Sequence, residues 1–572
     1  MRSKLSLILF FLGIATCVAS SSSYSIIYVP TTYEFGLIQV LPALFWFGFA
    51  ICLLSLLEGI NGDKEGVFFI KSLLLSMLIW NIPALFLKHI YFWESYSHIF
   101  EAIPIMLNGH MPSVSESLPS LFHYYPASFP GYHILLTSIL QITDIASVDF
   151  AKYYPLFSSA VTFLAIWLFF KTFLPSAGYR WALLLAILAN VYMQFHLSPQ
   201  SVGLIAGILT LVALEKADPR WRAIAILLFA YIIISHPTTA FIVLPAAGLA
   251  WFLRVLLVRD RKILLEPVPF LVIGWLVWSV FYAGPFQQVV AELATTAPTA
   301  PTMPTMPTVP TMPTVPTALT MPTTGIAFLD ICISEAWIRL QGVFYWAPRI
   351  RFIVLGVFGL SSVYYLVWQW LNKANRSQRL LITYTAFLIA PVIMTLIDVI
   401  FIREGQLHDR YFLFFSLVAS VLLVSLAERI RHPIMRNALL LALVFLALFN
   451  FTTVFYQSSR FIISDETISA SGFVNTKCVS SKVIGGRLVP DLVNNPYQSS
   501  ILRHTPLYQF YPQALASLEL PSIVVLDDHD RVWYESGYGI EKYNFYAQEA
   551  ADIFNKIYSN NKYTVYWFEG AK

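Results

Sequence analysis

The chain has 572 residues, of which 57% are hydrophobic and only 12% are charged. Soluble globular proteins average roughly 45–50% apolar and 25% charged residues, so this composition excludes a soluble enzyme, a nucleic-acid-binding protein and a disordered scaffold. The formal net charge of +4, from 36 Lys and Arg against 32 Asp and Glu, is too small to indicate a polyanionic partner.

The first apolar run, from about Leu5 to Val29, follows the basic residues Arg2 and Lys4. It contains a stretch of four serines, and residues 1–35 match either a signal anchor or a cleaved signal peptide. Both alternatives leave the residues that follow outside the cytoplasm.

Twelve more apolar runs make thirteen predicted transmembrane helices, the last twelve in a domain of residues 36–456. Basic residues cluster in every second loop, as expected of loops that stay in the cytoplasm. The pattern predicts an all-α, multi-pass protein of the cell membrane with a cytoplasmic N-terminus and an extracytoplasmic C-terminal domain. The twelve runs are 36–57, 66–88, 153–174, 180–197, 200–216, 222–236, 238–257, 264–284, 351–371, 380–402, 411–428 and 435–456.

A shorter apolar run, Tyr132 to Ile142, lies in the first large outer loop, residues 89–152. About eleven residues are too few to cross hydrocarbon, so we expect this run to lie at the outer membrane interface. A crossing here would place every later basic loop outside.

A second outer loop, residues 285–350, contains a three-residue Pro-Thr repeat over 298–324. Proline at every third position favours an extended polyproline-type chain and forbids a helix. The repeat is interpreted as an exposed spacer, with an O-glycosylated tract as the alternative.

Residues 457–572 are more polar and predict a small extracytoplasmic α/β domain. Asp527, Asp528, His529 and Asp530 suggest a cation site, but a polar loop explains them better because the ligand set is incomplete. The predicted strands are 479–484, 522–526 and 563–568, and the predicted helices are 467–474 and 548–559.

The four cysteines are widely spaced and form no metal or redox motif. Cys17 and Cys52 lie in apolar runs, where a thiol behaves as a small hydrophobic group. Cys332 and Cys478 lie in predicted outer segments, where they form either a disulfide or two unpaired thiols.

The first outer loop carries a motif that starts with Glu94 just beyond the third predicted span. His98 follows four residues later, Asn108 to Pro112 match a Gly-x-x-Pro helix end, and Tyr125-Pro126 leads to Gly131. This pattern resembles the first outer loop of the GT-C membrane glycosyltransferases, which include oligosaccharyltransferases, protein O-mannosyltransferases and aminoarabinose transferases. The resemblance implies transfer of a sugar from a polyprenyl-phosphate carrier to an acceptor outside the cytoplasm.

Physical chemistry gives Glu94 and His98 a plausible role of their own. A carboxylate at the membrane boundary costs free energy unless it is solvated, paired or used. Residues four apart share a helix face, and a carboxylate placed there can act as a general base for an acceptor hydroxyl. The alternatives are a solvated helix end for Glu94 and a packing or capping role for His98; Glu101 is expected to be exposed.

Further candidate substrate-binding residues lie in later outer turns. His196 and Gln200 stand where the GT-C pattern often has a second acidic residue, and they are interpreted either as sugar contacts or as a polar turn. His236 is either a substrate contact or a turn residue before Pro237. Tyr125 of the first loop, which matches the GT-C motif, is also predicted to bind substrate.

The phosphate of the lipid carrier needs a cationic partner, for which Arg is well suited. One candidate cluster is Arg339, Arg349 and Arg351. The preferred cluster, in a late outer loop, is Arg403, His408 and Arg410. No cofactor is predicted. A divalent metal is possible, but the Asp-x-Asp element that would supply its ligands is missing from the predicted transmembrane domain.

The leading hypothesis is an inverting glycosyltransferase with Glu94 as general base. Its expected partners are a polyprenyl-phosphate-sugar donor, the lipid bilayer and a glycan, lipid or protein acceptor, with no nucleic acid. A lipid or glycan flippase or transporter is the first alternative, and it would gain support if Asp398 and Arg403 lined a central cavity. A non-catalytic envelope protein is the second.

Overall fold

The computed structural model describes the helical part of the chain and the strands that follow it. The described residues are 2–24, 26, 29, 33–92, 94–110, 128–174, 178–189, 195–216, 218–258, 266–282, 346–371, 378–397, 408–455, 462–463, 465–477, 482–484, 504–505, 522–527, 555–559 and 563–568. The Pro-Thr repeat, Asp398, Cys332 and Cys478 lie outside these ranges, as do Asp528, His529 and Asp530.

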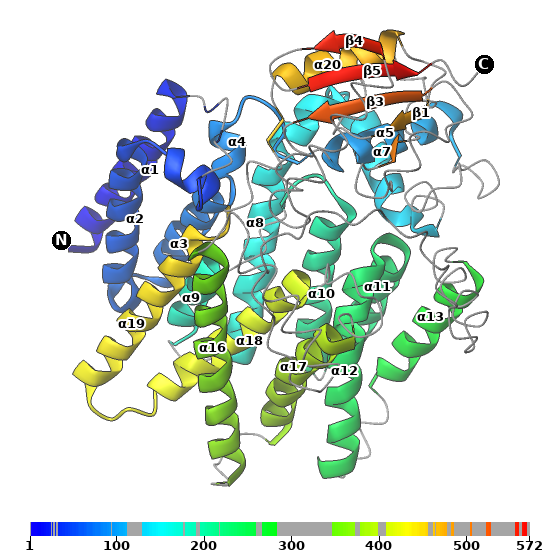
Figure 1. Ribbon diagram of the computed structural model, residues 1–572. Helices are drawn as coiled ribbons and strands as arrows, with labels where there is room; N and C mark the ends of the chain where they lie inside the picture. The colour runs from blue at the N-terminus through cyan, green and yellow to red at the C-terminus, as the bar shows by residue number, and fades with distance from the viewer. Residues whose placement is uncertain are drawn as a thin grey trace, which may run out of the picture.

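Helices make up nearly all of the described chain as far as residue 452 (Figure 1). Several of them, including α7, α10 and α11, have proline at one of their first two positions. Proline has no N–H, and at these positions an N–H would have no acceptor within the helix. The bounds are α1 Arg2–Ser23, the 3-10 helix η1 Gly36–Val40, α2 Ala43–Gly62, α3 Glu65–Trp80, α4 Ile82–Phe86, α5 Glu94–Asn108, α7 Pro130–Thr143, α8 Ser147–Phe173, α9 Tyr179–Ala189, α10 Pro199–Glu215, α11 Pro219–Ser235, α12 Pro237–Val258, α13 Val268–Phe281, α16 Trp346–Leu371, α17 Gln378–Ile397, α18 His408–Ala427 and α19 Pro433–Thr452.

Six of the described helices are long and apolar enough to cross a membrane, and five shorter apolar helices accompany them. Each of the thirteen predicted apolar runs falls on one or two of the helices. The chain is therefore a helical membrane protein, as its composition predicted. The number of crossings stays a prediction. The six long segments are Lys4–Ser23, Ala43–Gly62, Ser147–Phe173, Pro237–Val258, Arg349–Leu371 and Pro433–Thr452.

The predicted run 66–88 is not one continuous helix. It breaks at Asn81, between α3 and the short helix α4. Pro83 has no N–H to donate to the preceding turn, so the α-helical ladder cannot continue through it. The buried Asn81 side chain donates instead to the Met77 carbonyl and, across the bundle, to the Ser159 hydroxyl at 2.8 Å.

Helices α1 and α2 pack in antiparallel contact through a Gly-x-x-x-Cys sequence on each helix. A Cβ added to Gly13 would lie 2.7 Å from the Gly48 carbonyl oxygen, and one added to Gly48 would lie 2.7 Å from the Gly13 carbonyl oxygen. The Cys17 thiol donates to the Phe45 carbonyl. Small residues that let two backbones approach this closely are typical of helix contacts in membranes. Whether α1 is a signal anchor or a cleaved signal peptide stays a prediction.

The contact of α1 with α2 gives a testable prediction about Gly48. We expect Gly48→Ala to destabilise the protein by about 1–3 kcal/mol, because the added methyl group meets backbone atoms that cannot move independently. Gly248→Ala is the matched control, since nothing lies within 4 Å of a Cβ at that position in α12. Thermal unfolding in detergent measures both. Equal stability of the two variants would contradict the close packing.

The loops that were predicted to be cytoplasmic meet at one end of the bundle. Arg180 donates to the carbonyls of Ile60 and Asp63, and Lys171 forms an ion pair with Glu65. The Tyr384 hydroxyl donates to the Phe173 carbonyl and ties α17 to the same end. Beside them, the Lys71 ammonium lies 2.8 Å from the Asp63 carboxylate, with both side chains almost completely buried. These contacts bring segments that are far apart in the sequence together at one end of the bundle.

The C-terminal segment begins with α20 (Asp465–Lys477), and its strands are β1 Lys482–Ile484, β2 His504–Thr505, β3 Ser522–Asp527, β4 Asn555–Ser559 and β5 Tyr563–Phe568. They form one sheet in the order β2-β1-β3-β5-β4. Strand β1 is parallel to β2 and β3, whereas β5 is antiparallel to β3 and β4. The α20 residues Ala470 and Val474 pack on Val525 and Val565. The sheet lies at the end of the bundle that also carries α5 and α7 (Figure 1).

The helix predicted over 548–559 is wrong for residues 555–559, which form β4. The sequence there is Asn-Lys-Ile-Tyr-Ser, and β-branched and aromatic side chains fit a half-buried sheet surface. Tyr558 stacks on Phe473 of α20, with ring centroids 4.5 Å apart. This tertiary contact and the pairing with β5 outweigh the weak helical pattern. The other predicted strands and the helix 467–474 coincide with β1, β3, β5 and α20.

Candidate functional site

Helices α5 and α7 of the first large loop pack against each other at the sheet-bearing end of the bundle (Figure 1). The predicted interfacial run 132–142 lies within α7, whose 14 residues measure about 21 Å along the helix axis, less than the hydrocarbon thickness. Gly109, at φ +70°, ends α5 where the sequence predicted a helix end. Their shared core contains Ile90, Tyr96, Ile99, Ala102, Tyr132, Leu136, Leu140, Ala151, Tyr154, Leu197 and Ile463.

Other helices hold this pair in place. Trp278 of α13 donates its indole N–H to the Ser128 carbonyl just before α7. A Cβ on Gly131 would lie 2.4 Å from the Ser235 hydroxyl at the end of α11, so glycine is needed for this close approach. Tyr154 of α8 and Ser201 of α10 are joined by a hydrogen bond of 2.8 Å. The first outer loop is therefore held directly by α13 and α11, and Tyr154 of α8 lies in the apolar core that α5 and α7 share.

Glu94, the predicted base, is the first residue of α5. Its Oε2 atom lies 3.3 Å from Nε2 of His196, which comes from the segment before α10, 102 residues away. The His196 side chain is 3% exposed and its ring stacks on Phe92 at 4.2 Å, whereas the Glu94 side chain is 46% exposed. The structure therefore places a solvent-accessible carboxylate against a buried, fixed imidazole. The sequence had named both residues but had not paired them.

His98, the other predicted catalytic residue, forms a hydrogen bond with Glu101. Its Nδ1 atom lies 3.0 Å from Glu101 Oε2, and Nε2 of His133 from α7 lies 2.9 Å from the same oxygen. The expectation that Glu101 is exposed is wrong: its side chain is only 16% exposed. Glu101 is covered because α5 packs on α7, which brings the fully buried His133 against its carboxylate. The sequence did not predict this contact, because the two residues are 32 positions apart.

The charge of this His98–Glu101–His133 cluster follows from its burial and hydrogen bonds. Burial alone would raise the pKa of Glu101, but the hydrogen bonds with His133 and His98 outweigh burial and lower that pKa to about 2. Burial lowers the pKa of His133, more than its contact with Glu101 raises it. At neutral pH the cluster therefore holds a carboxylate beside a neutral His133 imidazole.

One face of α5 carries all of this chemistry. Consecutive residues of an α-helix are about 100° apart, so Glu94, His98 and Glu101 fall within about 60° of one another around the axis. His196 contacts one end of this polar row and His133 the other. The row faces polar and aromatic partners, and the apolar residues Ile99 and Ala102 of α5 face the core.

Two other predicted substrate-binding residues are buried in the helix bundle. His236 Nδ1 accepts from the backbone N–H of Thr239 and lies 2.8 Å from its hydroxyl, so His236 caps the first turn of α12. This geometry favours the turn interpretation over a substrate contact. Gln200, in the first turn of α10, is 9% exposed and lies four residues beyond His196.

The remaining predicted residues are described only in part. Tyr125 and Arg403 lie outside the described residues, and of His408 and Arg410 the backbone alone is described, in the first turn of α18. In the alternative basic cluster, Arg339 also lies outside the described residues, and Arg351 donates to the Thr453 carbonyl at 3.2 Å. The lipid-phosphate site stays a prediction.

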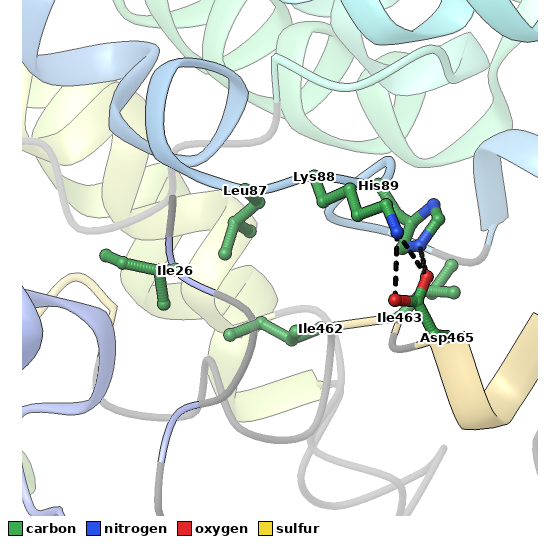
Figure 2. A pocket seen from close by; sticks show the side chains of 7 residues that line it. All are labelled: Ile26, Leu87, Lys88, His89, Ile462, Ile463 and Asp465. Carbon is green, nitrogen blue, oxygen red and sulfur yellow. Dashed lines mark hydrogen bonds and ion pairs between the residues drawn. The ribbon is translucent and has the colours of Figure 1, made fainter. Parts of the chain in front are cut away.

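A second polar contact joins the C-terminal segment to the helical domain (Figure 2). Lys88 and His89, after α4, both contact the carboxylate of Asp465 at the start of α20, with distances of 2.7–2.9 Å. The hydrogen bond from Lys88, followed by that from His89, lowers the pKa of Asp465. These residues border a small cavity whose other walls are apolar, formed by Ile26, Leu87, Ile462 and Ile463.

Sequence reasoning missed Glu101, His133 and the contact of Asp465 with Lys88. His133 lies two residues beyond the Tyr125–Gly131 motif, and its spacing from His98 and Glu101 matches no standard ligand pattern. Asp465 lies 377 residues from Lys88, a separation over which a single sequence carries no signal.

Comparison with known proteins finds no family model that matches this chain and no curated protein with significant sequence similarity. The class of helical membrane protein therefore rests on the composition and on the helices themselves.

Proposed function

We propose that the protein is a membrane glycosyltransferase that moves a sugar from a polyprenyl-phosphate-linked donor to an extracytoplasmic acceptor. The observation that carries the proposal is the Glu94–His196 pair: a carboxylate 46% exposed, fixed 3.3 Å from a buried imidazole at one end of an apolar helix bundle. A lipid-linked donor can reach such a site from the bilayer, and a polar acceptor can reach it from water.

The chemistry proposed for Glu94 is general base catalysis. Glu94 takes the proton of an acceptor hydroxyl as that oxygen forms a bond with the anomeric carbon of the sugar. The bond between the anomeric carbon and the phosphate oxygen breaks, and polyprenyl phosphate leaves with the bonding electrons. A single displacement of this kind inverts the anomeric carbon. His196 holds the carboxylate in position, and a positioned base contributes roughly 10²–10⁴-fold to the rate.

The predicted sidedness fits this proposal. Lys171, Arg180 and Arg254 lie near the ends of α8, α9 and α12 that flank the predicted cytoplasmic loops, and loops rich in Lys and Arg stay in the cytoplasm. The proposal assigns the end that carries α5, α7 and the sheet (Figure 1) to the extracytoplasmic side. Thirteen crossings, with the N-terminus inside, would place all of these groups on the sides proposed.

Cysteine labelling tests this sidedness. We expect Asn108→Cys, exposed at the end of α5, to react with a membrane-impermeant maleimide added to intact cells. Arg431→Cys, exposed between α18 and α19, is expected to react only after permeabilisation. The unmodified protein measures the signal from the native cysteines. Labelling of Arg431→Cys alone in intact cells would reverse the topology and contradict an outer site.

A flippase is the alternative that one experiment separates from a transferase. The purified protein is reconstituted in vesicles with a fluorescent polyprenyl-phosphate sugar and a soluble hydroxyl acceptor. A transferase converts the acceptor to a glycosylated product, whereas a flippase moves the fluorescent lipid between leaflets and forms no product. Movement of the lipid without product would contradict the proposed function.

A further inference from the structure

The side chains of His98, Glu101 and His133 form a cluster that has no part in the base catalysis proposed for Glu94 and His196. Its three ligand atoms, Nδ1 of His98, a carboxylate oxygen of Glu101 and Nε2 of His133, all lie within 4.8 Å of one another. The two nitrogen–oxygen distances are 3.0 and 2.9 Å. Two imidazoles and a carboxylate that converge on one point form a donor set typical of metal sites.

From this geometry we propose that His98, Glu101 and His133 bind a Zn²⁺ ion. Ligands at about 2.0–2.2 Å from a tetrahedral ion are roughly 3.3 Å apart, so the two nitrogen–oxygen distances need to lengthen by only a few tenths of an ångström. Imidazole nitrogen favours zinc over magnesium or calcium, which prefer oxygen ligands alone. The ion would replace the protons that the two imidazoles share with the Glu101 oxygen.

The helices hold these ligands in place before any ion arrives. His98 and Glu101 are three residues apart on α5, and residues at this spacing lie on the same helix face. The ring of Tyr132 is edge-on to both imidazoles, with centroids 5.6 Å from His98 and 5.2 Å from His133. The Thr137 hydroxyl of α7 donates to the Ala102 carbonyl of α5 beside them.

The exposure of the cluster is uneven. His133 is fully buried, whereas the side chains of His98 and Glu101 are each 16% exposed. A three-ligand zinc ion in this position keeps a fourth site open toward solvent, as in catalytic rather than structural zinc sites. That fourth position takes a water molecule or an anionic oxygen. The proposal stands on these residues alone and does not depend on glycosyl transfer.

Direct metal analysis tests the site. The protein is purified in detergent with a histidine-free tag, stripped with a chelator and titrated with Zn²⁺ against a chromogenic competitor. We expect one tightly bound zinc ion per chain. Loss of partners that merely orient a zinc ligand weakens binding about 10–100-fold, so loss of a ligand in Glu101→Gln or His133→Asn is expected to weaken it by at least about 100-fold.

Two matched variants and one spectroscopic signature complete the test. Glu94→Gln and His89→Asn, whose side chains are outside the cluster, are expected to bind zinc like the unmodified protein. His98→Cys keeps a ligand, and its Co²⁺ complex is expected to show a thiolate-to-cobalt charge-transfer absorption that the unmodified protein lacks. The cobalt spectrum of His98→Cys tests whether the cluster binds a metal ion even if Glu101→Gln fails to fold. Zinc binding that is absent, or equal in the unmodified protein and the ligand variants, would overturn the proposal.

Discussion

Replacing Glu94 with glutamine is expected to lower kcat/KM for sugar transfer by about 100-fold or more. The amide has nearly the same shape as the carboxylate but cannot accept the acceptor's proton, and a general base contributes at least about 10²-fold. The position at the first residue of α5 is retained, so the helix and its packing are not expected to change. Initial rates at subsaturating acceptor measure the effect.

Two further variants make this result specific. Glu58→Gln makes the same chemical change at an exposed position of α2 and is expected to leave the rate unchanged. His196→Asn is expected to lower the rate less than Glu94→Gln, because it removes only the partner that positions the carboxylate. If His196 acts through Glu94, the double variant is no slower than Glu94→Gln alone. Full activity of Glu94→Gln would show that the base lies elsewhere.

Removing the charge of Arg254 is expected to destabilise the protein by about 3–5 kcal/mol. Arg254 of α12 forms ion pairs with Glu215, the last residue of α10, and with Glu266, just before α13. It also donates to the Thr383 hydroxyl of α17. The three charged side chains are 4%, 9% and 7% exposed, so Arg254→Met would leave two carboxylates buried together without their cation.

The control for this prediction is rescue by neutralising the partners. Adding Glu215→Gln and Glu266→Gln to Arg254→Met is expected to recover much of the lost stability, because the remaining groups are neutral. Arg220→Met, at an exposed position near the start of α11, is expected to have little effect. Thermal unfolding in detergent gives the comparison. An Arg254→Met protein as stable as the Arg220→Met protein would contradict the buried network.

The helices were predictable because hydrophobic length is a local property of the chain. Each long apolar run became helical, and Pro83 was the local signal that the run 66–88 had to break. The strand β4 was not predictable in this way. Asn555 to Ser559 is short and polar enough to suit either state, and its pairing with β5 decides the outcome.

The candidate site was predictable as a region, but its pairings were not. Glu94, His98 and His196 were identified from the sequence, and the structure brings Glu94 and His196 together. The i,i+4 spacing suggested a Glu94–His98 pair, whereas tertiary packing gives His98 and His133 a common partner in Glu101. Contacts between residues 32 or 102 positions apart depend on how whole helices pack, which a single sequence does not reveal.

The most direct test of the proposed function is sugar transfer by the unmodified protein. The purified protein is incubated with a mixture of radiolabelled polyprenyl-phosphate sugars and with membrane acceptors, and the label in glycosylated product is counted. We predict product that increases with the amount of protein and that carries the anomeric configuration opposite to that of the donor. No transfer from any donor, by protein that is folded in detergent, would contradict the glycosyltransferase account.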